Sequence, residues 1–283
     1  MILVADSGAT KTDWVLIKED GKRPTSFSTI GLNPNYLDDK SVIDTEISRL
    51  AAESHCADQV DEVFFYGAGC CDDTNRQIIA KAVARNFAKA KIEVRTDLLG
   101  ACRACCGDSD GIVGILGTGS NSCVYQNGQI VENIPSAGYM LGDEGSGTYI
   151  GKQLLKAYLT ERMPRNLALE FGDSLNGLSR SQIMDRVYRQ PEPNKFFASL
   201  APFALNNVGN VFIHSLVECC LDGFFSNQIR YYHAELTDLY MVGSVAAILE
   251  EQLRVCAKKY GLELRKVLRK PIGGLVDYHS KKS

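Results

Sequence analysis

No apolar run in this sequence approaches the roughly 20 residues that a membrane-spanning helix needs. The first apolar stretch, residues 1–5, meets Asp6 and has no basic residue before it, so it is too short for a secretory signal. Low-complexity linkers are also missing. We therefore expect a folded cytoplasmic protein that has no membrane partner.

The chain also lacks a strong charge of either sign. Its 31 Lys and Arg residues nearly balance its 34 Asp and Glu residues, which gives a net charge of −3. Such a chain does not attract a polyanion over long distances, so we expect no nucleic-acid partner. The four histidines share no spacing, and we assign them no catalytic role.

Cysteine, by contrast, is abundant, with ten residues. Cys102, Cys105 and Cys106 superficially suggest a metal or cluster site. However, no second C-x-x-C or C-x-x-H pair stands at zinc-finger spacing. Because thiols in a reducing compartment pack as small hydrophobic side chains, we assign no metal to these cysteines.

A length of 283 residues exceeds one ordinary hydrophobic core and predicts two domains. In the first part, runs rich in β-branched and aromatic residues predict strands, and apolar residues at helical spacing predict helices. The expected strands cover residues 2–5, 14–18, 24–30, 60–66 and 92–96, with a turn at 19–21, and the expected helices cover 42–52, 74–87 and 98–106.

The pattern restarts after the polar residues 107–111. The expected strands then cover 112–116, 122–125, 129–134, 238–242 and 262–267, with a helix after residue 147 and others at 182–189, 208–225 and 245–259. A strand, a polar or glycine-rich turn and a second strand open both parts, which indicates an internal duplication. We predict an α/β protein with domains at 1–108 and 109–283, whose last helix is a candidate to pack back on the first domain.

Each opening turn has features of a phosphate-binding loop. In the first turn, a carboxylate at the end of a strand can hold hydrated Mg²⁺, and small residues let backbone N–H groups approach an anion. Its candidate residues are Asp6, Ser7, Gly8, Thr10, Lys11 and Thr12. The second turn offers Gly117, Thr118, Gly119, Ser120 and Asn121. Either turn alone is equally an ordinary hairpin, but a nucleotide between two domains needs one loop from each side, so the pair predicts nucleotide binding.

Three further segments are candidates for the same site. Asp143 lies in a segment with three glycines before a helix, where it either caps the helix or lies beside a ligand. Gly243 and Ser244 form a strand-to-helix turn that suits adenine and ribose, or is a plain turn. Asp97 follows a strand and precedes a helix, so it is either an N-cap or a base placed in the crevice at the carboxyl ends of the strands.

Together these segments resemble the acetate and sugar kinase/heat-shock chaperone/actin superfamily, and within it the BadF/BadG-type ATPase and N-acetylglucosamine kinase family. The most specific match is residues 138–146, with residues 117–121 about twenty residues earlier. The resemblance implies two similar ribonuclease H-like (actin-like ATPase) domains with a central cleft, ATP and Mg²⁺ as cofactors, and a homodimer. The implied reaction transfers the γ-phosphoryl group of ATP to the 6-hydroxyl of an amino sugar.

The resemblance also implies roles for individual residues. Asp6 and its hairpin would serve Mg²⁺ and the phosphates, residues 117–120 the nucleotide phosphates, and Gly243-Ser244 the adenosine. Asp97 would be the general base. Asn33 would bind a sugar hydroxyl, and Asn121 and Asp143 would reach toward sugar or metal.

The identity of the sugar stays open. Animal enzymes of the family carry Gly-Gly-Trp-Gly where this chain reads Ser136-Ala137-Gly138, so glucosamine, N-acetylmuramic acid or another hexosamine could replace N-acetylglucosamine.

Two other functions also stay open. An ATPase that activates a dehydratase or reductase through an iron-sulfur cluster is one alternative, which the cysteines at 102–106 keep open. A non-catalytic, sugar-binding regulator is the other.

Overall fold

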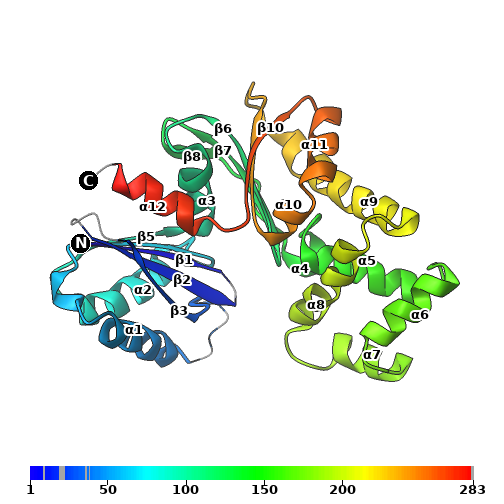
Figure 1. Ribbon diagram of the computed structural model, residues 1–283, viewed down its shortest axis with the longest axis horizontal. Helices are drawn as coiled ribbons and strands as arrows, with labels where there is room; N and C mark the ends of the chain where they lie inside the picture. The colour runs from blue at the N-terminus through cyan, green and yellow to red at the C-terminus, as the bar shows by residue number, and fades with distance from the viewer. Residues whose placement is uncertain (9, 19–22, 36, 38, 282–283) are drawn as a thin grey trace. The chain divides into compact units, whose positions relative to one another are not determined.

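The computed structural model describes residues 1–8, 10–18, 23–35, 37 and 39–281 (Figure 1). The turn expected at 19–21 and residue 9 of the first loop lie outside this part of the chain. The chain divides into two compact units. Unit 1 comprises Met1–Ser109, Asn127–Gln129 and Lys270–Ser283, and unit 2 comprises Asp110–Gln126 and Ile130–Arg269.

Unit 1 is built on a five-stranded sheet in the order β3-β2-β1-β4-β5. β1 pairs antiparallel with β2, and β4 and β5 continue from β1 in parallel. The strands are β1 (Ile2–Ser7), β2 (Lys11–Ile17), β3 (Thr25–Ile30), β4 (Glu62–Gly67) and β5 (Lys91–Thr96), and the helices are α1 (Ser41–Ser54), α2 (Asp73–Asn86), α3 (Asp97–Cys106) and α12 (Ile272–Ser280), with a short 3₁₀ turn η1 (Ala57–Gln59).

The two faces of this sheet are covered by different helices. Alternate residues such as Leu3, Trp14 and Phe65 form one core with α1 and α2. The intervening residues face α3 and α12, which lie on the opposite side of the sheet (Figure 1). Because Asp6 alternates with Ala5, it lies on the face of α3 and α12.

Unit 2 repeats this plan with a sheet in the order β10-β9-β6-β7-β8. Again one antiparallel hairpin, β6–β7, is extended by two parallel strands. The strands are β6 (Gly111–Leu116), β7 (Ser120–Gln126), β8 (Gln129–Glu132), β9 (Asp238–Val242) and β10 (Glu263–Leu268), and the helices are α4 (Gly138–Leu141), α5 (Gly147–Leu159), α6 (Arg165–Ser174), α7 (Arg180–Tyr188), α8 (Pro193–Asn206), α9 (Val211–Asn227), α10 (Ser244–Ile248) and α11 (Glu250–Lys259), with η2 (Ile229–Tyr231). The repeated strand order confirms the predicted duplication.

Several elements differ from the sequence-based expectations. The helix expected at 245–259 is two helices that meet at the buried Leu249. Helices α6 and α8 were not expected, and Pro202 inside α8 hides that helix from pattern analysis. Helix α12 covers residues 272–280 and includes both Gly273 and Gly274. None of the helices that the described residues form is long and apolar enough to span a bilayer.

Candidate active site

The first loop connects β1 to β2 and is held from within. The hydroxyl groups of Ser7 and Thr12 lie 2.8 Å apart, and both side chains are fully buried. Thr12 donates to the carbonyl of Ile30 at 2.9 Å, and Ser7 accepts from the backbone N–H of Leu32 at 3.1 Å. These two hydroxyls therefore tie the hairpin to the segment that leads to Asn33.

Asn33 is fixed beside the end of β4. Its side chain is 4% exposed, and its Oδ1 accepts from the backbone N–H of Asn35 at 2.9 Å. Gly69, with φ +81°, lies so close that a Cβ there would be 2.1 Å from this Oδ1. Asn75 of α2 donates to Asn35 Oδ1 at 2.8 Å and to the carbonyl of Gly69 at 2.9 Å. Gly69 and the Asn75 amide thus fix the position of Asn33, the residue predicted to bind a sugar hydroxyl.

Asp97 is the first residue of α3. The N-cap is Thr96, whose hydroxyl accepts from the N–H of Leu99 at 3.2 Å, so the cap position predicted as one alternative for Asp97 is already filled. Asp97 Oδ1 accepts from the N–H of Leu98 at 2.9 Å. Burial raises the pKa of the Asp97 carboxyl, although these backbone bonds oppose the rise.

Asp6 lies close enough to Asp97 for the two charges to interact. Burial, followed by repulsion from Asp97 and Asp13, raises the pKa of Asp6 to about 7, whereas Lys270 opposes the rise. Asp6 is the last residue but one of β1 and Asp97 follows β5, so both lie at the carboxyl edge of the sheet. The structure thus brings together two of the residues predicted from sequence.

Asp13 pairs directly with Asp6 across the β1–β2 hairpin. Its carboxylate binds two ammonium groups, Lys11 at 2.7 Å and Lys270 at 2.6 Å. Hydrogen bonds from these lysines hold the pKa of Asp13 below its usual value, in spite of partial burial. Sequence analysis missed both Asp13 and Lys270.

In unit 2, the second loop packs on the start of α5. The N–H groups of Gly147 and Thr148 donate to the carbonyls of Gly117 and Thr118, at 2.9 and 3.1 Å. A Cβ at Gly243 would lie 2.1 Å from the carbonyl oxygen of Leu116, just before the loop. The Gly243-Ser244 turn is therefore adjacent to this loop, as a shared nucleotide site requires.

Asp143 joins the same cluster. It adopts φ +59° and accepts from the N–H of Ser120 at 3.3 Å and from the hydroxyl of Ser136 at 2.7 Å. A Cβ at Gly119 would be 3.2 Å from Asp143 Oδ2, so the carboxylate lies against the loop. Ser136 stands in the segment where the sequence departs from the animal enzymes, and its contact with Asp143 was not expected.

A buried polar network supports the second loop from behind. Gln228, only 5% exposed, donates to the hydroxyl of Ser120 at 3.3 Å and accepts from the hydroxyl of Ser122 at 3.1 Å. Ser122 also lies 2.8 Å from the Tyr232 hydroxyl. Asn121 Oδ1 accepts from the N–H of Ser122 at 2.9 Å and so belongs to the same region. Sequence analysis missed Gln228 and Tyr232, because no local motif marks them.

The cysteines are mostly interior residues. Seven of the ten are buried, including Cys102, Cys105 and Cys106 of α3. Across the ranges described above, no three His, Cys, Asp or Glu side chains are grouped to hold a metal ion.

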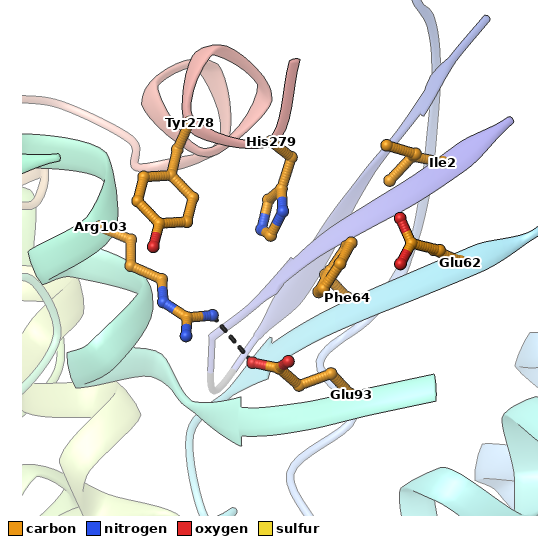
Figure 2. Close-up of a pocket in the computed structure, with 7 residues that line it drawn as sticks. All are labelled: Ile2, Glu62, Phe64, Glu93, Arg103, Tyr278 and His279. Atoms are coloured by element: carbon orange, nitrogen blue, oxygen red, sulfur yellow. Dashed lines mark hydrogen bonds and ion pairs between the residues drawn. The ribbon is translucent and has the colours of Figure 1, made fainter. Parts of the chain in front are cut away.

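A separate cavity of about 250 Å³ lies in unit 1 (Figure 2). Ile2 and Glu62, which begin β1 and β4, line it, so it lies at the opposite end of the strands from Asp6. Arg103 of α3 pairs there with Glu93 at 2.9 Å and donates to the Tyr66 hydroxyl at 2.6 Å. His279 of α12 has its Nε2 2.9 Å from the same hydroxyl, and its ring stacks on Phe64. These contacts attach the end of α12 to the sheet.

Comparison with known proteins decides the family. A model of the BadF/BadG/BcrA/BcrD ATPase family matches residues 5–205. The chain belongs to this family. Membership of the BadF/BadG/BcrA/BcrD ATPase family confirms the resemblance predicted from the sequence and supports the use of ATP. No curated protein matches the chain.

Solved structures of similar proteins extend the comparison over nearly the whole chain of this BadF/BadG/BcrA/BcrD family member. A protein of Porphyromonas gingivalis, provisionally named an N-acetylglucosamine kinase, has 40% identity, 99% coverage of each chain and a TM-score of 0.91. A Chromobacterium violaceum protein with the same provisional name has 19% identity, 98% coverage of each chain and a TM-score of 0.68. A ROK family glucokinase from Streptomyces griseus, in complex with glucose and AMPPNP, has 15% identity, coverage of 99% of this chain and 98% of its own, and a TM-score of 0.56. The last two show the fold alone. Together the three confirm the predicted α/β fold of two actin-like ATPase domains.

Proposed function

We propose that this protein is an ATP-dependent kinase that transfers the γ-phosphoryl group to the 6-hydroxyl of N-acetylglucosamine or a related hexosamine. The observation that carries the proposal is the grouping of Asp6, Asn33 and Asp97 at one edge of the sheet of unit 1. The relative from P. gingivalis, at 40% identity over nearly the whole chain, supports a sugar as the acceptor.

Asp97 is the proposed general base. Phosphoryl transfer to an alcohol needs a group that accepts the hydroxyl proton, and this role is filled by a carboxylate in many kinases. Burial raises the pKa of Asp97, which brings it closer to the pH at which a base accepts a proton well. Asn33, held by Gly69 and Asn35, would bind another hydroxyl of the sugar and so orient the 6-hydroxyl toward Asp97.

Asp6 fits a magnesium ion, because its oxygen atoms are hard ligands and its ionised form is disfavoured without a cation. When bound, Mg²⁺ would neutralise charge on the ATP phosphates. Asp143 is the second carboxylate proposed for metal or sugar. In the first loop, Gly8, Thr10 and Lys11 remain candidates for phosphate binding, while Ser7 and Thr12 would contribute through backbone groups.

In unit 2, the loop of Gly117, Thr118, Gly119 and Ser120 would bind ATP phosphates, with Asn121 behind it. Gly243 and Ser244 would lie against the adenosine. Because the N–H groups of Gly147 and Thr148 are already bonded within the protein, the start of α5 supports the loop and does not itself offer free donors.

The alternative of an iron-sulfur ATPase is disfavoured by the burial of Cys102, Cys105 and Cys106 in α3. A cluster that bridges a dimer needs its cysteine ligands at the surface. The proposed function also gives Asn33 and Asp97 a purpose that the activator role does not.

ADP release, measured by a coupled assay over a panel of hexosamines, tests the proposal. We expect release that depends on one amino sugar and on Mg²⁺. ATP hydrolysis that is the same with and without every sugar, or a brown protein with stoichiometric iron after anaerobic purification, would contradict it.

A further inference from the structure

Lys270 lies at the candidate active site, two residues before the last helix of the chain. Its Nζ lies 2.6 Å from Asp13 Oδ2, while Lys11 Nζ lies 2.7 Å from Oδ1 of the same carboxylate. One carboxylate therefore holds two ammonium groups and cannot neutralise both of them.

The strand register places Asp13 and Lys11 on the same face of the sheet as Asp6. Asp6 and Asp13 are paired across β1 and β2, and side chains at paired positions lie on the same face of a sheet. Lys11, two residues before Asp13 on β2, lies on that face as well. The influence of Lys270 on the ionisation of Asp6 agrees with this placement.

Helix α12, which begins two residues after Lys270, packs closely on the rest of unit 1. A Cβ at Gly274 would lie 2.4 Å from the carbonyl oxygen of Ala104, so α12 approaches α3 as closely as two backbones allow. At the far end of α12, His279 is 4% exposed, stacks on Phe64 at 3.8 Å between ring centroids and contacts the Tyr66 hydroxyl (Figure 2). The first contact holds the start of α12, and with it Lys270, beside the hairpin, and the second fixes the direction of the helix.

The two lysines have capacity for another ligand. Their side chains are 57% and 52% exposed, for Lys270 and Lys11, while that of Asp13 is 19% exposed. An ammonium group has three N–H donors, and the ion pair with Asp13 occupies one on each lysine. Exposed ion pairs of this kind add little to stability. Holding α12 in place is therefore a weak explanation for the ion pairs that Asp13 makes with Lys11 and Lys270.

We propose that Lys270 is a further phosphate-binding residue, which acts together with Lys11 on the terminal phosphate of a nucleoside triphosphate. Asp13 holds the two ammonium groups in place. The remaining N–H donors of both lysines then bind oxygen atoms of the same phosphate group. The assignment of this phosphate to a kinase reaction rests on the proposed function, but the binding itself does not.

Calorimetric titration of the full chain with Mg·ATP, tripolyphosphate and AMP tests the proposal without sugar or turnover. Lys270→Met keeps the aliphatic stem and removes the charge, and Lys270→Arg keeps the charge. Because a hydrogen bond to a charged group is worth about a tenfold change in affinity or more, Lys270→Met should weaken ATP and tripolyphosphate about tenfold and leave AMP unchanged. Lys270→Arg should restore most of the affinity, and the loss should shrink in high salt.

Lys281→Met is the matched control, because it removes the lysine that directly follows the other end of α12, and it should change none of the three affinities. Unchanged ATP affinity in Lys270→Met, or an equal loss for AMP, would overturn the proposal. If Lys270→Met does not fold, Lys270→Gln together with the salt dependence of the native chain decides in the same way. A chain that binds tripolyphosphate through Lys270 but phosphorylates no sugar would remove the proposed function and leave this inference intact.

Discussion

Asp6, near the end of β1, and Asp97, just after β5, lie close enough for their carboxylates to repel one another. Together with burial, this repulsion raises the pKa of Asp6 to about 7. Two enclosed carboxylates destabilise the fold unless a cation or a proton joins them, so their presence at one edge of a sheet is typical of a functional site. Lys270 and Lys11, both bound to Asp13, supply part of the compensating charge.

The stability of the metal-free protein should therefore depend on the ionisation of Asp6. Its pKa is about 7 in the folded chain and about 3.9 in an unfolded one. Between these values the folded chain binds a proton that the unfolded chain has lost, so this contribution to stability is present below about pH 4 and is lost as the pH rises through 7. Asp6→Asn should therefore raise the free energy of unfolding at pH 8.

The gain is at most a few kcal/mol, because each pH unit between the two pKa values is worth about 1.4 kcal/mol. Urea unfolding at pH 5 and pH 8 measures it, and the gain should be smaller at pH 5. Asp58→Asn, at an exposed position, serves as the control. An Asp6→Asn effect that is the same at both pH values would show that Asp6 ionises normally.

Asp97→Asn should lower kcat by about 10²–10⁴, the usual size of a general-base contribution, while sugar affinity stays nearly unchanged. Asparagine keeps the shape of the side chain but cannot take the hydroxyl proton. Steady-state kinetics and direct sugar binding on the same preparation check both parts. Turnover close to that of the native enzyme would exclude Asp97 from the role of base.

Asn75 should act on the sugar through the loop that it holds. Asn75→Ala removes the bonds to Asn35 and to Gly69, and so releases the support of Asn33. We expect the KM for sugar to rise about tenfold, the effect of one or two lost hydrogen bonds, with little change in the KM for ATP. Asn86→Ala, which loses a bond to Ala82 within the same helix, is the control. Equal effects of Asn75→Ala on both substrates would indicate general loosening of unit 1.

Adjacent glycines of α12 offer a test of how tightly this helix is attached. A Cβ at Gly274 would meet the backbone of Ala104, whereas a Cβ at Gly273 would meet nothing within 4 Å. Gly274→Ala should therefore cost about 1–3 kcal/mol of stability, as overpacking does. Gly273→Ala should be neutral or stabilise by up to about 1 kcal/mol, because alanine favours the helix. Chemical denaturation of both variants measures the difference, and equal stabilities would refute the close contact.

Much of the fold was predictable because its signals are local. Alternating and helical patterns located most strands and helices, and the repeated strand–turn–strand opening predicted the duplication. Helix α12 has no clear local signal, because Gly273 and Gly274 are poor helix formers, and only its packing on Ala104 explains why a glycine stands at position 274.

The candidate site was predictable where a motif marks it, and not where tertiary structure creates it. Lys270 lies 257 residues from Asp13 in the sequence, and Gln228 lies 108 residues from Ser120, so no local pattern joins these pairs. The direction of the Ser7 and Thr12 side chains, toward the core, could have been predicted from the alternation along each strand. Ser7 alternates in step with Leu3 and Ala5, and Thr12 with Trp14, all of which face the core.

Phosphorus-31 NMR of the protein with Mg·ATP and N-acetylglucosamine or a related hexosamine tests the central claim most directly. The account predicts that ADP and a phosphate monoester coupled to the protons at C6 of the sugar appear together, and that both disappear with Asp97→Asn. ADP accompanied only by inorganic phosphate, at the same rate with and without any hexosamine, would contradict it.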